Sequence, residues 1–353
     1  MEIVYVHLGT TKNTYLKDAI ERSLSLFPKI QHTLILDNFD SVSVNSPKVK
    51  IVMNDSKILD SETLSREVDL DFRQGYWNLT LERIFALLDY QIKNNIEDIL
   101  HVESDVILMP TFPFQSIAGC NFIHWCEYGE GHDVAALLHI PNSHNANLIR
   151  NQMISILRSH PNLTDMQLLH STRNNVENVR LFPSVGLDNC EPNSTLDTSY
   201  CLCLPGNFIF DGLTYGMYIT GQDPRNNYGR FSVGDNSPFE SGATNINPRK
   251  FSWSVNDSGL PFAKSDCCGK VFSLQNIHVH SKNKKLFGSN WQITLVQLVG
   301  IANRHKKVNF FSSKTLYEML KKSVKSGETR QFIDKSPPVA RLKRAVLVLV
   351  RGK

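Results

Sequence analysis

The sequence of 353 residues lacks several patterns that would place it in a common class of protein. None of its cysteines forms the C-x-x-C pair of a zinc site, and its longest apolar run, Ala345 to Val350, is far shorter than the ~20 residues that a membrane-spanning helix needs. The chain has no internal repeat and no low-complexity block, and Met1 is followed directly by a strand pattern instead of a basic, apolar leader. Apolar residues at 41% and charged residues at 20% are ordinary for a globular protein. We therefore expect a folded, soluble protein without a signal peptide.

The seven cysteines do not suggest a disulfide framework. Cys201 and Cys203 are separated by one residue, and Cys267 and Cys268 are adjacent. Adjacent cysteines rarely bridge each other, and intracellular proteins keep their thiols reduced. The cysteine pattern therefore predicts reduced thiols and a cytoplasmic location.

Charge is distributed unevenly along the chain. Residues 303–353 contain 14 Lys or Arg and 3 Asp or Glu, a net charge of +11. Because the whole chain carries +4, residues 1–302 carry the remaining −7. The basic tail indicates one of two things: peripheral contact with an anionic membrane face through Lys343, Arg344 and the apolar run beside them, or an exposed basic helix. Both interpretations remain open from the sequence.

The first hundred residues alternate between strand and helix patterns. Short apolar runs predict strands, and apolar residues spaced three and four apart predict helices. This alternation is typical of an α/β sandwich with a mostly parallel central sheet. The predicted strands cover residues 3–6, 33–36, 49–53, 99–102 and 106–109, and the predicted helices cover residues 16–27 and 79–93.

In sheets of this kind, ligands bind beyond the carboxyl ends of the strands. The loops that follow Val6, Leu36 and Val102 should therefore lie on one rim. Farther along, glycine, asparagine and proline accumulate between Gly206 and Pro261, which predicts loops around a pocket. A helical segment is expected from about Trp291 onward.

The triplet Glu103-Ser104-Asp105 interrupts two apolar runs. Two buried carboxylates need a cation, a basic partner or solvent, because burying an unpaired charge is costly. In an extended segment residues i and i+2 face the same side, so both carboxylates can point into one site. Oxygen ligands of this type suit Mn²⁺ or Mg²⁺. A polar turn that happens to contain two acids is the plainer alternative.

The segment Asn276 to Lys282 alternates polar and apolar residues. Alternation places His278, His280 and Lys282 on one face, where imidazole can bind a transition metal and an ammonium can bind phosphate. A half-exposed edge strand with a polar face is the alternative interpretation.

Four stretches of the chain share a pattern with one family: residues 76–83 (YWNLTLER), 101–106 (HVESDV), 210–225 (from FDG to GQDPR) and 278–282 (HVHSK). Together they resemble the GT-A glycosyltransferases, and more closely a group of bacterial-type sugar transferases. The resemblance implies a GT-A, Rossmann-like α/β/α sandwich with a mostly parallel central sheet. We expect this catalytic domain over residues 1–290, followed by a helical, basic appendage over residues 291–353.

In such enzymes an acid-x-acid motif at the end of a central strand holds a divalent cation on the diphosphate of a sugar nucleotide. Carried over to this chain, Asp105 is the main metal ligand and His280 the third protein ligand. Glu103 binds the ribose, or the metal through water, and replaces the aspartate that is commoner at this position. Lys282 neutralises the leaving diphosphate.

The same resemblance implies a nucleotide site on the rim. Leu8, Gly9 and Thr10 would cradle the base and ribose, and Asp37 would accept a hydrogen bond from the base. Arg83 would reach the nucleotide or pair with the neighbours of Glu82, and an exposed helical arginine is the alternative.

Two aspartates are candidates for the chemistry at the sugar. Asp211 and Asp223 would hydrogen-bond the donor sugar or deprotonate the acceptor hydroxyl. Asp223 precedes a proline, so a turn-forming role is the alternative.

The resemblance implies transfer of a sugar from a nucleotide-diphosphate donor, with UDP-sugars favoured and GDP-sugars an alternative. The acceptor would be a hydroxyl of a glycan or of a lipid-linked molecule, and nucleic acid is not an expected partner. Two rival functions remain: a metal-dependent hydrolase using the same acid and histidine cluster, and a non-catalytic carbohydrate-binding protein.

Overall fold

A computed structural model describes residues 1–9, 15–38, 44, 46–54, 58, 75–129, 131–184, 204, 206–223 and 247–308. Within these residues the helices are α1 (Leu16–Leu26), α2 (Tyr76–Asn94), α3 (Phe114–Ala118), α4 (Ser143–Ser159), α5 (Asp165–Asn175), α6 (Thr214–Thr220) and α9 (Trp291–Val308), with short 3₁₀ helices η4 (Pro248–Lys250) and η5 (Lys284–Leu286). The strands are β1 (Glu2–His7), β2 (Gln31–Leu36), β3 (Val49–Met53), β4 (Ile99–Val102), β5 (Val106–Leu108), β6 (Ile123–Gly129), β7 (His132–Ile140), β8 (Val179–Leu181), β9 (Phe208–Ile209), β10 (Phe251–Val255), β11 (Pro261–Ser265), β12 (Val271–Leu274) and β13 (Asn276–His278).

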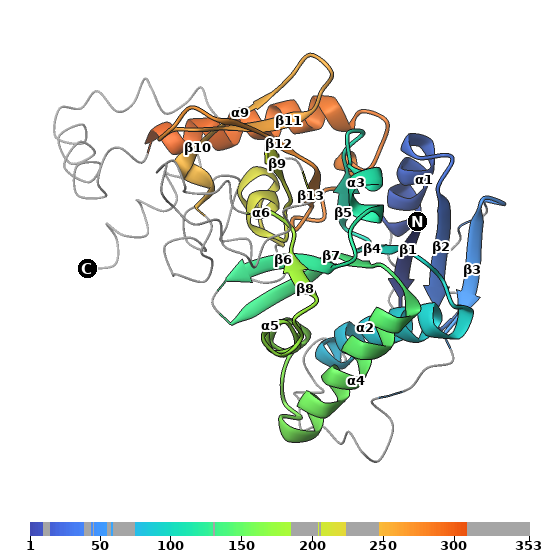
Figure 1. Cartoon of the computed structure of the whole chain (residues 1–353). Coiled ribbons are helices and arrows are strands. Elements are labelled where there is room, and N and C mark those ends of the chain that lie inside the picture. Colours follow the sequence, from blue (N-terminus) through green and yellow to red (C-terminus); the bar gives the residue numbers. More distant parts are fainter. Residues whose placement is uncertain are drawn as a thin grey trace, which may run out of the picture. The chain divides into compact units, whose positions relative to one another are not determined.

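The central sheet follows the order β3-β2-β1-β4-β7-β6-β8 in the described part of the chain (Figure 1). β1 pairs in parallel with β2 and β4, β2 with β3, and β6 with β8. Only β7 runs against its neighbours, β4 and β6. The predicted mostly parallel sheet is confirmed, and the short apolar runs of β1, β2 and β4 form its buried centre, as expected for parallel strands covered on both faces.

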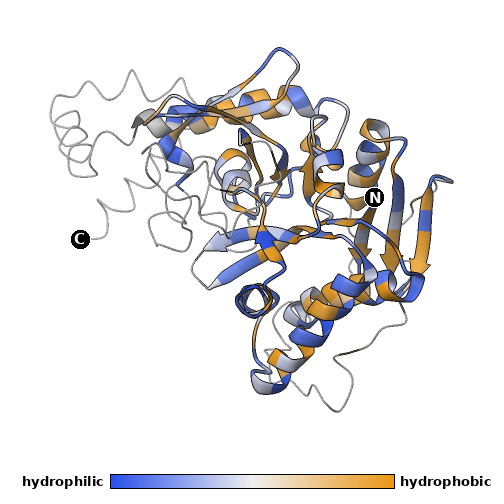
Figure 2. Ribbon diagram, in the orientation of Figure 1, coloured by the Kyte–Doolittle hydropathy of each residue, from blue (hydrophilic) through white to orange (hydrophobic). Residues whose placement is uncertain are grey.

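Helices cover both faces of this sheet. Val4 and Val6 of β1 point to one face, where α2, α4 and α5 pack against them. Ile3 and Tyr5 point to the other face, where α1 and α3 lie. Apolar residues concentrate in the strands, whereas α5 is largely polar (Figure 2). This two-sided burial confirms the predicted α/β/α sandwich.

A second layer of strands follows the sandwich in the sequence. β9 to β12 form a sheet in the order β10-β11-β12-β9, while β13 pairs only with β5 among the described strands. Their core includes Tyr215 and Tyr218 of α6 and Trp253 of β10, all nearly inaccessible to solvent. The prediction of loops between Gly206 and Pro261 is therefore wrong for the described part of that range, because these aromatic residues form a packed core.

The chain divides into a unit from Met1 to Arg304 and a second unit from His305 to Lys353. The first part of α9 contributes Leu295, Val299 and Ala302 to the core of the first unit. The boundary predicted at residue 290 stays a prediction, and the basic tail beyond residue 308, with Lys343 and Arg344, lies outside the described residues. No helix among the described residues is long and apolar enough to cross a membrane.

The cysteines differ from the sequence prediction at one position. Cys120, Cys126 and Cys268 form no disulfide, but Cys267 is disulfide-bonded. The interpretation of every cysteine as a reduced thiol is therefore wrong for Cys267. The cysteine pattern consequently no longer supports a cytoplasmic location.

α6 packs closely against β13, and this contact depends on Gly216. A Cβ atom at Gly216 would overlap the main-chain oxygen of His278 and lie 2.6 Å from Oδ2 of Asp211. Both obstacles belong to parts of the core that have little room to move, since protein interiors are close-packed.

We expect Gly216→Ala to lower the free energy of unfolding by at least about 2 kcal/mol, because overpacking a rigid core forces its backbone to shift. Gly300→Ala is the matched control, since Gly300 also lies in a helix, but a Cβ atom added there would have no neighbour within 4 Å among the described residues. That change should be neutral or stabilise the protein by up to about 1 kcal/mol. Urea unfolding of both variants measures the difference, and equal effects would refute the close-contact argument.

Candidate active site

The acidic triplet lies at the carboxyl end of β4, near the centre of the sheet. The amide of Glu103 donates to the carbonyl of Ala136 on β7 at 3.1 Å, so the sheet still holds this residue. The amide of Val106 donates to the carbonyl of Glu103 at 3.0 Å, which closes a tight turn. This turn ends the strand and sends the chain into β5, as the apolar–acidic–apolar pattern predicts.

A two-stranded antiparallel ladder then brings a histidine to the acids. β13 pairs with β5 so that His278 lies opposite Val106. The amide of Val279 also donates to the carbonyl of Asp105 at 2.7 Å. The ladder therefore fixes His278 beside Asp105 although the two residues are 173 positions apart in the sequence.

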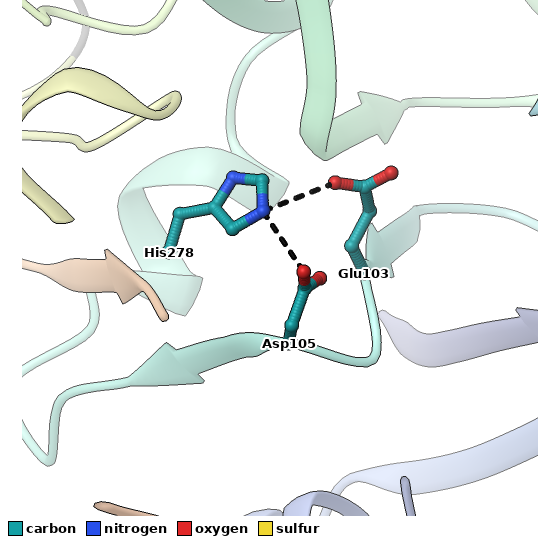
Figure 3. Close-up of side chains that lie close together, drawn as sticks. All are labelled: Glu103, Asp105 and His278. Carbon is teal, nitrogen blue, oxygen red and sulfur yellow. Dashed lines mark hydrogen bonds and ion pairs between the residues drawn. The ribbon is translucent and has the colours of Figure 1, made fainter. Parts of the chain in front are cut away.

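Glu103, Asp105 and His278 form a cluster in which one ligand atom from each residue lies within 4.8 Å of the others. Nε2 of His278 is 3.1 Å from Oδ2 of Asp105 and 3.8 Å from Oε2 of Glu103. Figure 3 shows the imidazole of His278 directed at both carboxylates. Asp105 and His278 are each only 7% exposed, so this polar group is largely withdrawn from solvent.

The hydrogen bonding of His278 defines which ring nitrogen faces the acids. Nδ1 lies 2.7 Å from the carbonyl oxygen of Gly212, which can only accept, so Nδ1 carries a hydrogen. In a neutral ring Nε2 then has a lone pair directed at the carboxylates. Two acceptors facing each other require a proton or a metal cation between them. Metal-binding histidines commonly donate their other ring N–H to a carbonyl in this manner, so the residues fit a divalent cation with two oxygen ligands and one nitrogen ligand.

Arg83 of α2 keeps Glu103 ionised. Its Nη2 donates to Oε1 of Glu103 at 3.0 Å. Burial alone would raise the pKa of Glu103, but the charge of Arg83, followed by those of His278 and His101, lowers that pKa to about 2. Pairing of Arg83 with Glu103 was not predicted, and its contact with a nucleotide stays a prediction.

Lys282 reaches the same cluster from the turn after β13. Its ammonium pairs with Oδ2 of Asp105, the oxygen that also faces His278. The backbone of Lys282 is left-handed, with φ of 56°, and its amide donates to the carbonyl of Val279 at 2.9 Å. This turn carries both His278 and Lys282 to Asp105.

Asp211 lies next to the cluster but faces the backbone. Its carboxylate accepts N–H groups from His278 and Gly216, each at 2.8 Å, and from Tyr215 at 3.0 Å. The residue is fully buried, and this burial raises its pKa to about 6 despite the three hydrogen bonds. Both carboxylate oxygens of Asp211 are thus occupied by backbone amides of β13 and α6. A general base would instead direct a carboxylate oxygen at the substrate.

His280 and Asp223 contact each other. The amide of Asp223 donates to Nδ1 of His280 at 2.9 Å, and the rings of His278 and His280 are 6.2 Å apart. The three-residue cluster thus contains His278, while His280, the predicted ligand, lies beside it with one nitrogen engaged by Asp223. Asp223 is 3% exposed and stays a candidate for contact with substrate.

The predicted nucleotide loop is partly described. The amide of Gly9 donates to Oδ2 of Asp37 at 2.8 Å, so the ends of β1 and β2 meet as expected for neighbouring parallel strands. Gly9 has a φ of 90°, which suits glycine, and Leu8 is buried beneath the loop. Thr10 lies outside the described residues.

Asp165, the first residue of α5, lies near Arg83 and was not among the residues singled out from the sequence. Its Oδ1 is buried and has no hydrogen-bond partner among the described residues. Burial raises the pKa of Asp165, while the nearby charge of Arg83 opposes that rise. The only local pattern was an acid in the first turn of a helix, which is common in proteins and does not indicate a site.

No family model and no curated protein matches the chain. Among solved structures, an active-site mutant of LgtC is 13% identical with a TM-score of 0.38, covering 52% of this chain and 73% of LgtC. The glycosyltransferase GlyE of Streptococcus pneumoniae TIGR4 is 14% identical with a TM-score of 0.33, covering 51% of this chain and 44% of GlyE. The PaToxG glycosyltransferase is 12% identical with a TM-score of 0.33, covering 49% and 68%.

These three proteins are glycosyltransferases. At such TM-scores the likeness carries no argument about this chain. The arrangement that the resemblance implies is nevertheless present in this chain: a mostly parallel sheet, an acid-x-acid motif after a central strand, and a late histidine beside it. Function is therefore argued below from the site.

The low pKa of Glu103 predicts an acid-dependent loss of stability. Because its folded-state pKa is about 2 and its ordinary value 4.5, the unfolded state binds more protons between these values. Stability should therefore fall as the pH falls from about 4.5 to 2, by about 3 kcal/mol from this group. In Glu103→Gln this contribution should disappear, so its unfolding free energy in EDTA should vary less over that range. Parallel pH profiles for the two proteins would contradict the assignment.

Proposed function

We propose that the protein is a divalent-metal-dependent glycosyltransferase that uses a nucleotide-diphosphate sugar, with UDP-sugars favoured over GDP-sugars. The observation that supports this most directly is the cluster of Glu103, Asp105 and His278 at the carboxyl end of β4. The position is where parallel α/β sheets bind ligands, and the donor set suits Mn²⁺ or Mg²⁺, which usually also bind substrate phosphates.

Within this proposal Asp105 and His278 are the direct ligands. Glu103 completes the set, directly or through water, and Arg83 holds its carboxylate ionised and in position. His280 remains a further candidate ligand beside them. The cation, when bound, stabilises negative charge that develops on the departing diphosphate.

Three other residues have supporting roles. Lys282 supplies an ammonium at the edge of the cluster that can contact a phosphate oxygen. Asp211 acts through His278 as a positioning residue, because it fixes the amide of that histidine. Asp223, buried beside His280, is the candidate for contact with the donor sugar or the acceptor hydroxyl.

The nucleotide would lie along the rim formed by the ends of β1 and β2. Gly9 and Asp37 meet there, and Gly9 leaves room for close approach of a ligand to the backbone. The acceptor would be a hydroxyl of a glycan or of a lipid-linked molecule. Contact of the basic tail with a membrane, and a cytoplasmic location, stay predictions.

The deciding experiment is thermal unfolding of the purified chain with a panel of UDP- and GDP-sugars, with and without Mn²⁺. A ligand that binds only the folded state stabilises it by mass action and so raises the melting temperature. At a ligand concentration of one hundred times the Kd, the free energy of unfolding rises by about 2.7 kcal/mol. We expect a shift with one donor class that requires the metal and disappears in Asp105→Ala.

Asp257→Ala is the matched control, because Asp257 is an exposed aspartate of the same unit. It should shift as the unmodified protein does. Absence of any nucleotide-dependent shift at millimolar ligand would exclude the transferase and favour a carbohydrate-binding protein. Metal-dependent cleavage of phosphate esters without a sugar donor would instead favour the hydrolase.

A further inference from the structure

Oδ2 of Asp105 faces two other side chains besides any metal, those of Lys282 and His278. It accepts the ammonium of Lys282, and it lies 3.1 Å from Nε2 of His278. The side chain of Asp105 is 9% exposed and that of Lys282 22% exposed, so water screens this ion pair poorly. The ammonium also lies 5.9 Å from the ring centroid of Tyr15, which adds a weak favourable contact at this position.

Oδ2 is also the oxygen of Asp105 that faces Nε2 of His278, so a divalent cation held between these two residues would bind that oxygen. Ligand oxygens lie about 2.0–2.1 Å from Mg²⁺, and an ammonium hydrogen-bonded to that oxygen would be only a few ångströms from the cation. Two positive centres this close in a poorly hydrated site repel strongly. Lys282 must therefore leave Asp105 when the cation binds.

The position of Lys282 in the fold limits where its ammonium can go. Its backbone is fixed by the turn that starts at His278, where the amide of His280 donates to the carbonyl of His278 at 2.8 Å and the amide of Lys282 to that of Val279. Only the flexible side chain can move, so the ammonium stays near the cluster and needs a new anionic partner. The diphosphate of the proposed donor is an anion that would arrive at this position.

We propose that Lys282 competes with the divalent cation for Asp105 and couples cation binding to diphosphate binding. This inference rests on the proposed function. The ammonium weakens binding of the cation alone, and a diphosphate relieves the competition by accepting the ammonium. The cation and the nucleotide consequently bind together far better than either binds separately, and by linkage each raises the affinity of the other equally.

The test compares the full chain with Lys282→Met, which keeps the apolar stem and removes the charge. Binding of Mn²⁺ alone is followed by the electron paramagnetic resonance of the free ion, and binding of UDP at saturating Mn²⁺ by calorimetry. We expect Mn²⁺ alone to bind about tenfold tighter to the variant, and UDP to bind about tenfold weaker. A purely structural role for Lys282 would weaken both, so the opposite signs identify competition.

Three further variants complete the design. Lys285→Met, an exposed lysine of the same segment, should behave as the unmodified chain. Lys282→Arg keeps the positive charge and should therefore bind Mn²⁺ alone as weakly as the unmodified chain. This variant tests the competition for Asp105 even if Lys282→Met does not fold. Asp105→Ala should lose Mn²⁺ binding.

The failures are distinguishable. Unchanged or weaker binding of Mn²⁺ alone to Lys282→Met overturns the competition but leaves the proposed function standing. Absence of Mn²⁺ binding to any of these proteins, with or without UDP, removes the metal site and with it both proposals.

Discussion

The carboxylate of Asp211 joins its own segment to α6 and to β13. Its two oxygens accept amides from β13 and from the first turn of α6, and its own amide and carbonyl are paired with the side chain of Asn276. Full burial makes the ionised form costly, which is why its pKa is raised to about 6. The hydrogen bonds from backbone amides offset part of that cost. The close approach of Gly216 to Asp211 and to the backbone of His278 leaves no room for a side chain between these residues.

Charge is balanced pairwise around the site. Glu103 is compensated by Arg83, and Asp105 by Lys282. Buried ion pairs are weak evidence for stability, because desolvation opposes the attraction between the partners. Their arrangement here is more informative: Arg83 lies behind Glu103 on α2, while Lys282 approaches Asp105 from a turn. The guanidinium of Arg83 is therefore positioned by a helix of the sandwich, whereas the ammonium of Lys282 lies at the end of a flexible side chain that extends from a turn.

The local features of the fold could be predicted from the sequence. β1, β2, β3, β4 and α1 follow the apolar patterns closely, and the acids of the triplet lie at the end of β4 because the triplet itself ends that strand. The resemblance named His280 as the ligand, but alternation places both His278 and His280 on one face and does not distinguish them. Which histidine lies beside Asp105 depends on the register of β13 against β5, which the local sequence does not contain.

The role of Asp211 was hidden for the same reason. Next to a glycine, in a segment rich in loop-forming residues, it resembled a substrate-facing loop acid. Only the packing of α6 and the second sheet, with Tyr215, Tyr218 and Trp253 at their core, buries it. The glycine and asparagine content of this segment indicated loops, whereas its aromatic residues are buried and form a packed layer.

The ladder between β5 and β13 also has a consequence for the order of folding. It closes a long loop of the chain, since Asp105 and His278 are 173 residues apart. Closing so long a loop costs conformational entropy before the new contacts compensate for it, so distant pairings form late. The parallel strands β1 to β4, which are closer together in the sequence and covered by α1 and α2, can assemble earlier. A newly made chain would thus contain a nearly complete sheet whose two acids still lack their histidine until the last third of the protein has been synthesised and has docked.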